Sequence, residues 1–274
     1  MNLITRKELY NLDWKVLQNH ALTFKAINQL KTSDEDEKAY AFYLGMRVEG
    51  YRSIFFYEGD YSKTESEKEK ERNLLLVSLG KWFEETVLKK DPSLDLKCII
   101  LGKSSNVELE KFDIQYNWMN SNKTLTELLV NDWNELYFRA LTVMGIWKIL
   151  KVKEVNGEDV HDIKKTLEAF YFYIGMRMVT YRGVYPYEPA FVDIDSIATN
   201  AQLEVIVAML VMGQEFEKIY LHKEYGTPLE DFLFTDHKKF LQMAYSHPKI
   251  GKTMRRRQTF TNRLSIEEIR NLLY

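Results

Sequence analysis

The side chains in this sequence that are best suited to chemistry are arginines placed between tyrosines. Tyr43, Arg47 and Tyr51 follow one another at intervals of four residues, and this spacing puts them on one stripe of a helix. A guanidinium group stacks on aromatic rings and binds carboxylates or phosphates. The pattern therefore allows two interpretations: these residues fasten helices together, or they bind an anion or a partner.

The same stripe occurs twice in the chain. "YLGMRVEGYR" starts at Tyr43 and "YIGMRMVTYR" starts at Tyr173, and residues 39–58 match residues 169–188 at ten of twenty positions. Two further segments recur in the same order: "DWKVLQNHALT" at Asp13 matches "DWNELYFRALT" at Asp132, and "GKWFEE" at Gly80 matches "GQEFEK" at Gly213. Because chance matches would not keep this order, we infer an internal duplication.

Each matched segment predicts a helix, because its apolar residues recur at steps of three and four. Ser33 is a candidate N-cap for the second helix, and the acids after it suit the first turn. We expect an all-α fold of two duplicated three-helix units packed as a helical array, with a basic C-terminal segment and a short terminal helix. The predicted boundaries are 1–118, 119–245 and 246–274. Residues 92–118, which include "LKCIIL", could hold a short strand, but we interpret them as an irregular connection.

We interpret the residues that both copies keep as scaffold. A glycine inside a helix costs about 1 kcal/mol relative to alanine, so Gly45 and Gly175 suggest that a neighbouring backbone or ring leaves no room for a Cβ. An arginine in so apolar a helix needs an acidic partner, which we expect in Glu84 and Glu217. Next in line as acidic partners are Glu58 and Glu188.

The predicted scaffold residues fall into two matching sets. They are Trp14, Tyr43, Gly45, Arg47, Tyr51, Arg52 and Glu84 in the first copy, and Trp133, Tyr173, Gly175, Arg177, Tyr181, Arg182 and Glu217 in the second. The alternative stays open: the four arginines and nearby tyrosines could form a paired site for an anion or a partner.

The composition is typical of a globular protein without a strong global charge. Apolar residues make up 45% of the chain and the net charge is −2, which gives no overall attraction to nucleic acid or to an anionic membrane. The longest apolar run, Val205 to Met212, is far too short to span a bilayer. With one cysteine, Cys98, and no signal-peptide pattern at the start, we expect a cytoplasmic protein.

The sequence contains no motif that indicates an enzyme. The five histidines form neither a His-Glu-x-x-His pattern nor an i, i+4 pair, so we expect no metal. Phosphate-binding glycine loops and Gly-x-Ser-x-Gly elbows do not occur, and Cys98 lies among Leu and Ile like a buried apolar residue. We therefore expect no catalytic residues and no cofactor.

Two charged stretches are the candidate partner-binding residues. The acid-rich run contributes Glu58, Asp60, Glu65 and Glu67, which would suit a basic partner such as a nuclease. Near the C-terminus, six cations fall between Lys249 and Arg263 with no acid among them; Arg255, Arg256 and Arg257 form their centre. This second cluster would suit an acidic protein or nucleic acid, or it could be a solvated loop.

Parts of the sequence also resemble a known group of proteins. The start "MNLITRKELYNLDWKVL", the segment "AFYLGMRVEGYRSIFFYEGD" and the segment "YNWMNSNKTLTELLVNDWNELYFRAL" resemble the helical immunity proteins of bacterial polymorphic toxin systems, particularly the immunity protein 49 family. The likeness covers roughly the first 150 residues. It implies a cytoplasmic protein that binds and neutralises a cognate toxin and has no catalytic residues.

Three other functions remain as alternatives. The chain could be a helical protein that binds nucleic acid through its basic C-terminal segment, a structural protein of a phage or mobile element, or, last, an enzyme acting through the repeated Arg and Tyr residues. A steep salt dependence of nucleic-acid binding would favour the first of these.

Overall fold

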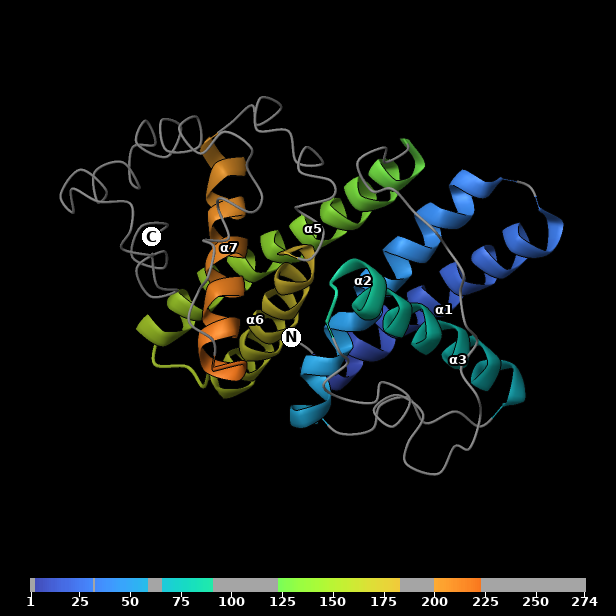
Figure 1. The fold of residues 1–274 in the computed structure, drawn as a ribbon. Coiled ribbons are helices and arrows are strands. Elements are labelled where there is room, and N and C mark those ends of the chain that lie inside the picture. The colour runs from blue at the N-terminus through green and yellow to red at the C-terminus, as the bar shows by residue number, and fades with distance from the viewer. Residues whose placement is uncertain (1–2, 32, 59–65, 91–122, 183–199, 223–274) are drawn as a thin grey trace. The chain divides into compact units, whose positions relative to one another are not determined.

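The computed structural model describes residues 3–31, 33–58, 66–90, 123–182 and 200–222. Within these ranges the chain forms six α-helices and one π-helical segment, and no strand, so the all-α class is confirmed (Figure 1). The chain divides into two compact units. We call Ile4–Asp132 the N-terminal unit, and Trp133–Tyr274 together with Met1–Leu3 the C-terminal unit. The predicted boundaries at 118–119 and 245–246 and the possible strand lie outside the described residues.

The N-terminal unit is built from three mutually packed helices, α1 (Arg6–Leu30), α2 (Asp34–Glu58) and α3 (Glu67–Trp82). The predicted N-cap is confirmed, because the Ser33 hydroxyl accepts a hydrogen bond of 3.2 Å from the amide of Asp36. The short π-helix η1 (Phe83–Val87) continues α3.

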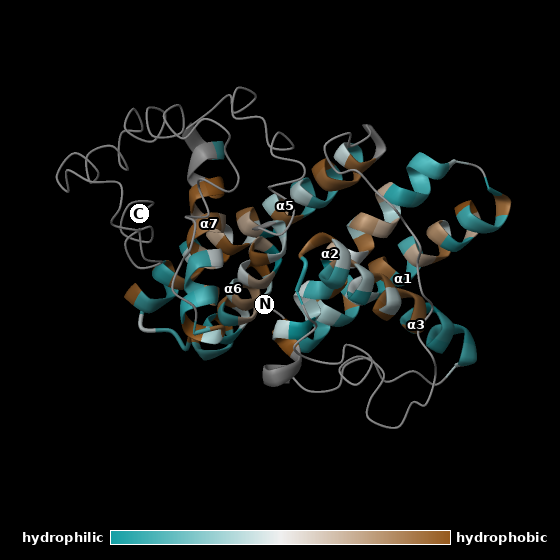
Figure 2. Cartoon of the chain, in the orientation of Figure 1, coloured by the Kyte–Doolittle hydropathy of each residue, from teal (hydrophilic) through white to brown (hydrophobic). Residues whose placement is uncertain are grey.

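The C-terminal unit contains most of α5 (Lys123–Val155), α6 (His161–Arg182) and α7 (Asn200–Tyr220). Helices α6 and α7 pack against each other. Hydrophobic residues gather on α7, and the run from Val205 to Met212 is buried throughout (Figure 2). This burial explains why the run contains no polar residue, unlike a helix with one face toward solvent.

The two glycines of the duplicated helices fit tightly against a neighbouring helix, as predicted. A Cβ on Gly45 would lie 2.6 Å from the Cβ of Phe83, and one on Gly175 would lie 2.7 Å from the Cβ of Phe216. Each would also meet a backbone carbonyl oxygen one turn earlier, at 2.7 Å from Leu79 and 2.6 Å from Met212. The alignment pairs these neighbours, so the duplicated segments make the same contact in both units.

Two ring contacts repeat as well. Phe42 meets Phe83 edge to face at 5.1 Å, and their counterparts Phe172 and Phe216 meet in the same way at 5.0 Å. The paired tryptophan–tyrosine contacts are Trp14–Tyr51 at 4.8 Å and Trp133–Tyr181 at 5.4 Å. Edge-to-face pairs of this kind add about 0.5–1.5 kcal/mol each to the burial of the rings. The residues that both copies keep therefore lie at corresponding places in the interior of each unit.

Candidate functional site

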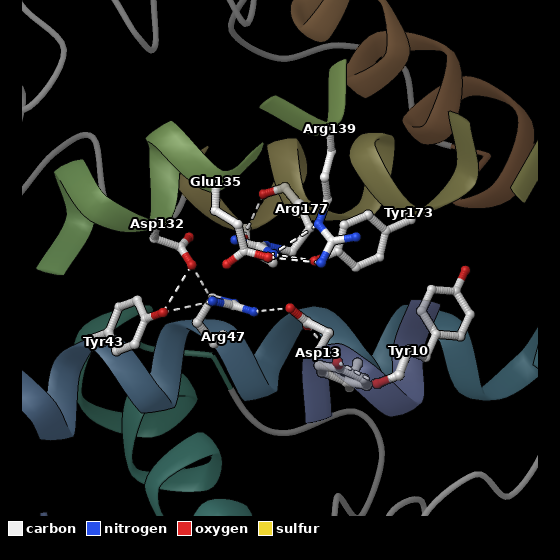
Figure 3. Close-up of polar contacts among 11 residues, drawn as sticks. Tyr10, Asp13, Tyr43, Arg47, Asp132, Glu135, Arg139, Tyr173 and Arg177 are labelled. Carbon is white, nitrogen blue, oxygen red and sulfur yellow. Dashed lines mark hydrogen bonds and ion pairs between the residues drawn. The ribbon is translucent and has the colours of Figure 1, made fainter. Parts of the chain in front are cut away.

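The arginine of the N-terminal stripe lies in a buried polar network (Figure 3). The side chain of Arg47 is fully buried and forms ion pairs with Asp13 of α1 and Asp132 of α5, both also buried. Arg47 donates a hydrogen bond of 2.7 Å to the Tyr43 hydroxyl, and that hydroxyl donates one of 2.9 Å to Asp132. Tyr51 completes the network by donating to Asp13. The charge of Arg47 is thus balanced inside the unit.

The expectation that Glu84 would be the acidic partner of Arg47 is wrong. Glu84, which lies in η1 and is fully buried, pairs with Arg52 instead. Arg52 follows Arg47 by five positions, which corresponds to about 140° around an α-helix, so the two arginines face different neighbours. Arg47 turns toward α1 and α5, whereas Arg52 turns toward η1.

The sequence contained a signal for the true partners of Arg47. Asp13 and Asp132 each precede a tryptophan in the duplicated "DW" pair, and both were among the identities of the alignment. An acid kept at the same place in both copies, next to a core tryptophan, is expected to be buried and therefore paired with a cation.

The C-terminal unit places its arginine in a similar way. Arg177 is buried, donates a hydrogen bond to the Tyr173 hydroxyl and lies over the Tyr173 ring, with 5.5 Å between guanidinium carbon and ring centroid. The matching distance from Arg47 to the Tyr43 ring is 5.6 Å. The side chain of Arg182 lies outside the described residues. Arginines as deeply buried as Arg47 and Arg177 are poorly placed to meet a partner at the surface.

A groove at the surface of the N-terminal unit is a better candidate for binding. It lies between α1 and α3, has a volume of about 490 Å³, and includes the buried Ala21 and Phe24 in its lining. Partly exposed leucines extend this apolar lining: Leu22, Leu74 and Leu75. The volume is within the range of sites that hold a small ligand or several side chains of a protein.

Charged side chains surround this α1–α3 groove. Lys25 and Glu71 form an ion pair of 3.2 Å across it, and both are substantially exposed. Lys68 and Arg72 are two further cations of the lining, and neither has an acidic partner among the described residues. Three cations against one anion give the groove a positive balance, so it suits an acidic partner.

Of the residues predicted to bind a partner, only Glu67 has a described side chain. It is 86% exposed and pairs with Lys70 on the first turns of α3. The side chain of Glu58 and all of Asp60, Glu65 and Arg255–Arg257 lie outside the described residues. Sequence reasoning missed the α1–α3 groove because its lining comes from two helices whose pairing the spacing of residues does not specify.

Searches for other kinds of site and for relatives gave negative results. In the described ranges, no group of three or more His, Cys, Asp and Glu residues is arranged to hold a metal ion. No described helix is both long enough and apolar enough to cross a membrane. Comparison of the chain with protein-family models, with characterised proteins and with solved structures found no match.

Proposed function

We propose that the chain is a non-catalytic binding protein, an immunity protein that binds and neutralises a cognate bacterial toxin. The observation that carries the proposal is the contrast between interior and surface in the N-terminal unit. The duplicated charged residue Arg47 is enclosed by acids in the core, while a cationic groove with partly exposed leucines faces solvent. A fixed scaffold that presents such a groove loses little freedom when it binds a partner.

The sequence supports the same function. The segments that resemble helical immunity proteins include the start of α1 and the whole Tyr43–Arg52 stripe, which form the core of the N-terminal unit. An inhibitor of this kind needs a contact of about 800 Å² on its own side. The α1–α3 groove would supply the centre of such a contact, with the neighbouring helix surfaces around it.

The experiment that tests this function has two steps. The tagged full-length chain is used to retrieve partners from its native lysate, with and without nuclease, and each retained protein is then expressed alone and together with the chain. We expect one stoichiometric protein that survives nuclease treatment, stops growth when expressed alone and is harmless with the chain present. Partners that vanish with nuclease, or a partner that is never toxic, would contradict the proposal.

A further inference from the structure

The α1–α3 groove has the dimensions of two turns of a helix. Its lining runs from Ala21 to Gln29 on α1 and from Lys68 to Leu75 on α3, which corresponds to about 12 Å and about 10 Å along the two helices. Two such helices side by side form a trough open to solvent, with apolar residues between charged edges. This is the shape that receives an amphipathic helix, whose anchors recur at intervals of three and four residues.

The charges at the edges favour one kind of occupant. Lys68 and Arg72 lie one turn apart on α3 and have no acidic partner among the described residues, and the Arg72 Nε lies away from solvent without a hydrogen-bond acceptor. Lys25 lies on α1 at the opposite edge of the groove and forms an ion pair with Glu71. A helix with acids beside its apolar stripe would meet cations on both sides.

These cations are specific to the N-terminal unit. Extending the matched segments without gaps places Met144 at the position of Lys25, Ala201 at that of Lys68 and Val205 at that of Arg72. The scaffold residues named above recur in both copies, whereas these three cations do not. Their presence in one copy alone points to a role at the surface rather than in the fold.

We infer that the α1–α3 groove binds an acidic amphipathic helix of the partner protein. The inference rests on the proposed function, because it supposes that the chain binds a protein. It adds the location of the binding site and the interactions that form the contact. The apolar stripe of the helix lies on Leu22, Leu74 and Leu75, and its carboxylates pair with Lys25, Lys68 and Arg72. Of the two alternatives that the charged stretches left open, a basic partner or an acidic one, the groove thus favours an acidic partner.

Labelled helical peptides of about four turns test the inference on the full chain. One carries leucines at i, i+3 and i+4 with glutamates beside them; a second has lysines in place of the glutamates; a third keeps the glutamates but has glutamines in place of the leucines. Binding is followed by fluorescence anisotropy at low salt and at about 0.15 M salt. We expect the first peptide to bind at least about ten-fold more tightly than either of the others.

Charge reversal locates the binding. In Lys68→Glu/Arg72→Glu the acidic peptide should lose about ten-fold in affinity and the lysine peptide should gain. The matched control, Lys15→Glu/Lys70→Glu, makes the same change in net charge at exposed positions of α1 and α3 outside the groove, and it should change affinity less than about two-fold. Thermal unfolding followed by circular dichroism checks that both variants are folded.

Several results would overturn the inference. Equal binding of the acidic and lysine peptides, equal losses in the two double variants, or full affinity of the glutamine peptide would each do so; the last would indicate a site for small anions. The partner retrieved from the lysate separates this inference from the proposed function. If a toxin binds Lys68→Glu/Arg72→Glu as tightly as the unaltered chain, the groove is not its binding site, but the proposed function stands. If no retrieved partner is toxic, the proposed function itself is refuted.

Discussion

Each unit has a helix in which a glycine touches a phenylalanine and an arginine follows two positions later, buried against a tyrosine. One polar contact of the N-terminal unit has no such counterpart in sequence. There the Asn73 side-chain oxygen accepts hydrogen bonds from Trp14 at 3.0 Å and from Gln18 at 2.9 Å. The alignment places Ile206 at the position of Asn73 and Tyr137 at that of Gln18.

The surfaces of the two units differ more than their interiors. Where α1 presents Lys25 beside the groove, α5 has Met144, and the exposed side of α5 carries apolar residues: Phe138 is 66% exposed and Val152 is 60% exposed. A duplication starts with two identical surfaces, so residues that remain equal mark what packing requires. Among exposed residues, those that differ between the copies are not required by the shared packing, which is why we assign the partner contact to a unit-specific groove.

The largest expected effect removes a shared core residue. Arg47→Ala leaves Asp13 and Asp132 buried without their cation, and we expect it to lower the free energy of unfolding by about 3–5 kcal/mol. Denaturant unfolding followed by circular dichroism measures the loss. Arg177→Ala tests whether the two units are alike, because equivalent scaffolds predict a similar decrease in the free energy of unfolding. A stable Arg47→Ala variant that no longer binds its partner would instead favour the surface-site interpretation of the arginines.

The glycines give a smaller effect with an internal control. Gly45→Ala and Gly175→Ala each force a Cβ against a backbone oxygen, and we expect each to destabilise the protein by about 2 kcal/mol. Gly145 lies in α5 with open space around its Cβ position, so Gly145→Ala should stabilise by up to about 1 kcal/mol. Melting temperatures of the three variants suffice. A loss at only one of Gly45 and Gly175 would show that the two interiors differ in tolerance.

The sequence predicts some of these features and not others. The all-α class, the N-cap at Ser33 and the close approach at Gly45 follow from local spacing and from the duplication, and the structure confirms them. The spacing of residues does not choose between Asp13 and Glu84 as the partner of Arg47, because that choice depends on the rotation of three helices about their axes. The same holds for the groove, which exists only once α1 and α3 are paired.

The π-helical segment η1 is another feature that the sequence does not reveal. The amide of Leu88 donates to the carbonyl of Phe83, five residues earlier, in the π-helical η1 that carries Glu84. A π-helical turn differs from an α-helical one by a single residue, and the sequence "GKWFEE" has no proline or other breaker to reveal it. The direction of the Glu84 side chain could therefore not be derived from α-helical periodicity.

The Asn73 contact allows one unit to be converted toward the other. Asn73→Ile introduces the residue of the C-terminal copy and leaves the buried donors of Trp14 and Gln18 without their acceptor, so we expect a loss of about 1–2 kcal/mol. Adding Gln18→Tyr imports the second member of the pair and should recover part of that loss. Burial raises the pKa of Tyr137, the native tyrosine at the aligned position, above its ordinary value. Additive losses in the double variant would show that the pair does not act as a unit.

The smallest contrast concerns how α1 and α5 begin. When the match at Asp13 is extended toward the N-terminus, "TRKE" at Thr5 corresponds to "TLTE" at Thr124. The first forms a capping box: the Thr5 hydroxyl accepts from the Glu8 amide at 3.3 Å, and the Glu8 carboxylate accepts from the Thr5 amide at 2.8 Å. Helix α5 begins at Lys123, so its threonine lies within the helix. Thr5→Ala should therefore cost about 1 kcal/mol in unfolding free energy.

The capping box of α1 also predicts a dependence on pH. Hydrogen bonds from the Thr5 amide and hydroxyl lower the pKa of Glu8 in the folded state below its ordinary value of 4.5. A carboxyl with a lowered folded pKa contributes stability that is fully present above the unfolded pKa and is lost as the pH falls through the folded one. Melting temperatures of the unaltered chain and of Glu8→Gln should thus differ above about pH 5 and converge as the pH falls through the lowered pKa of Glu8. Glu127→Gln removes the corresponding carboxylate, which is exposed and belongs to a helix that begins before its threonine, so a similar convergence there would show that the effect does not arise from the cap.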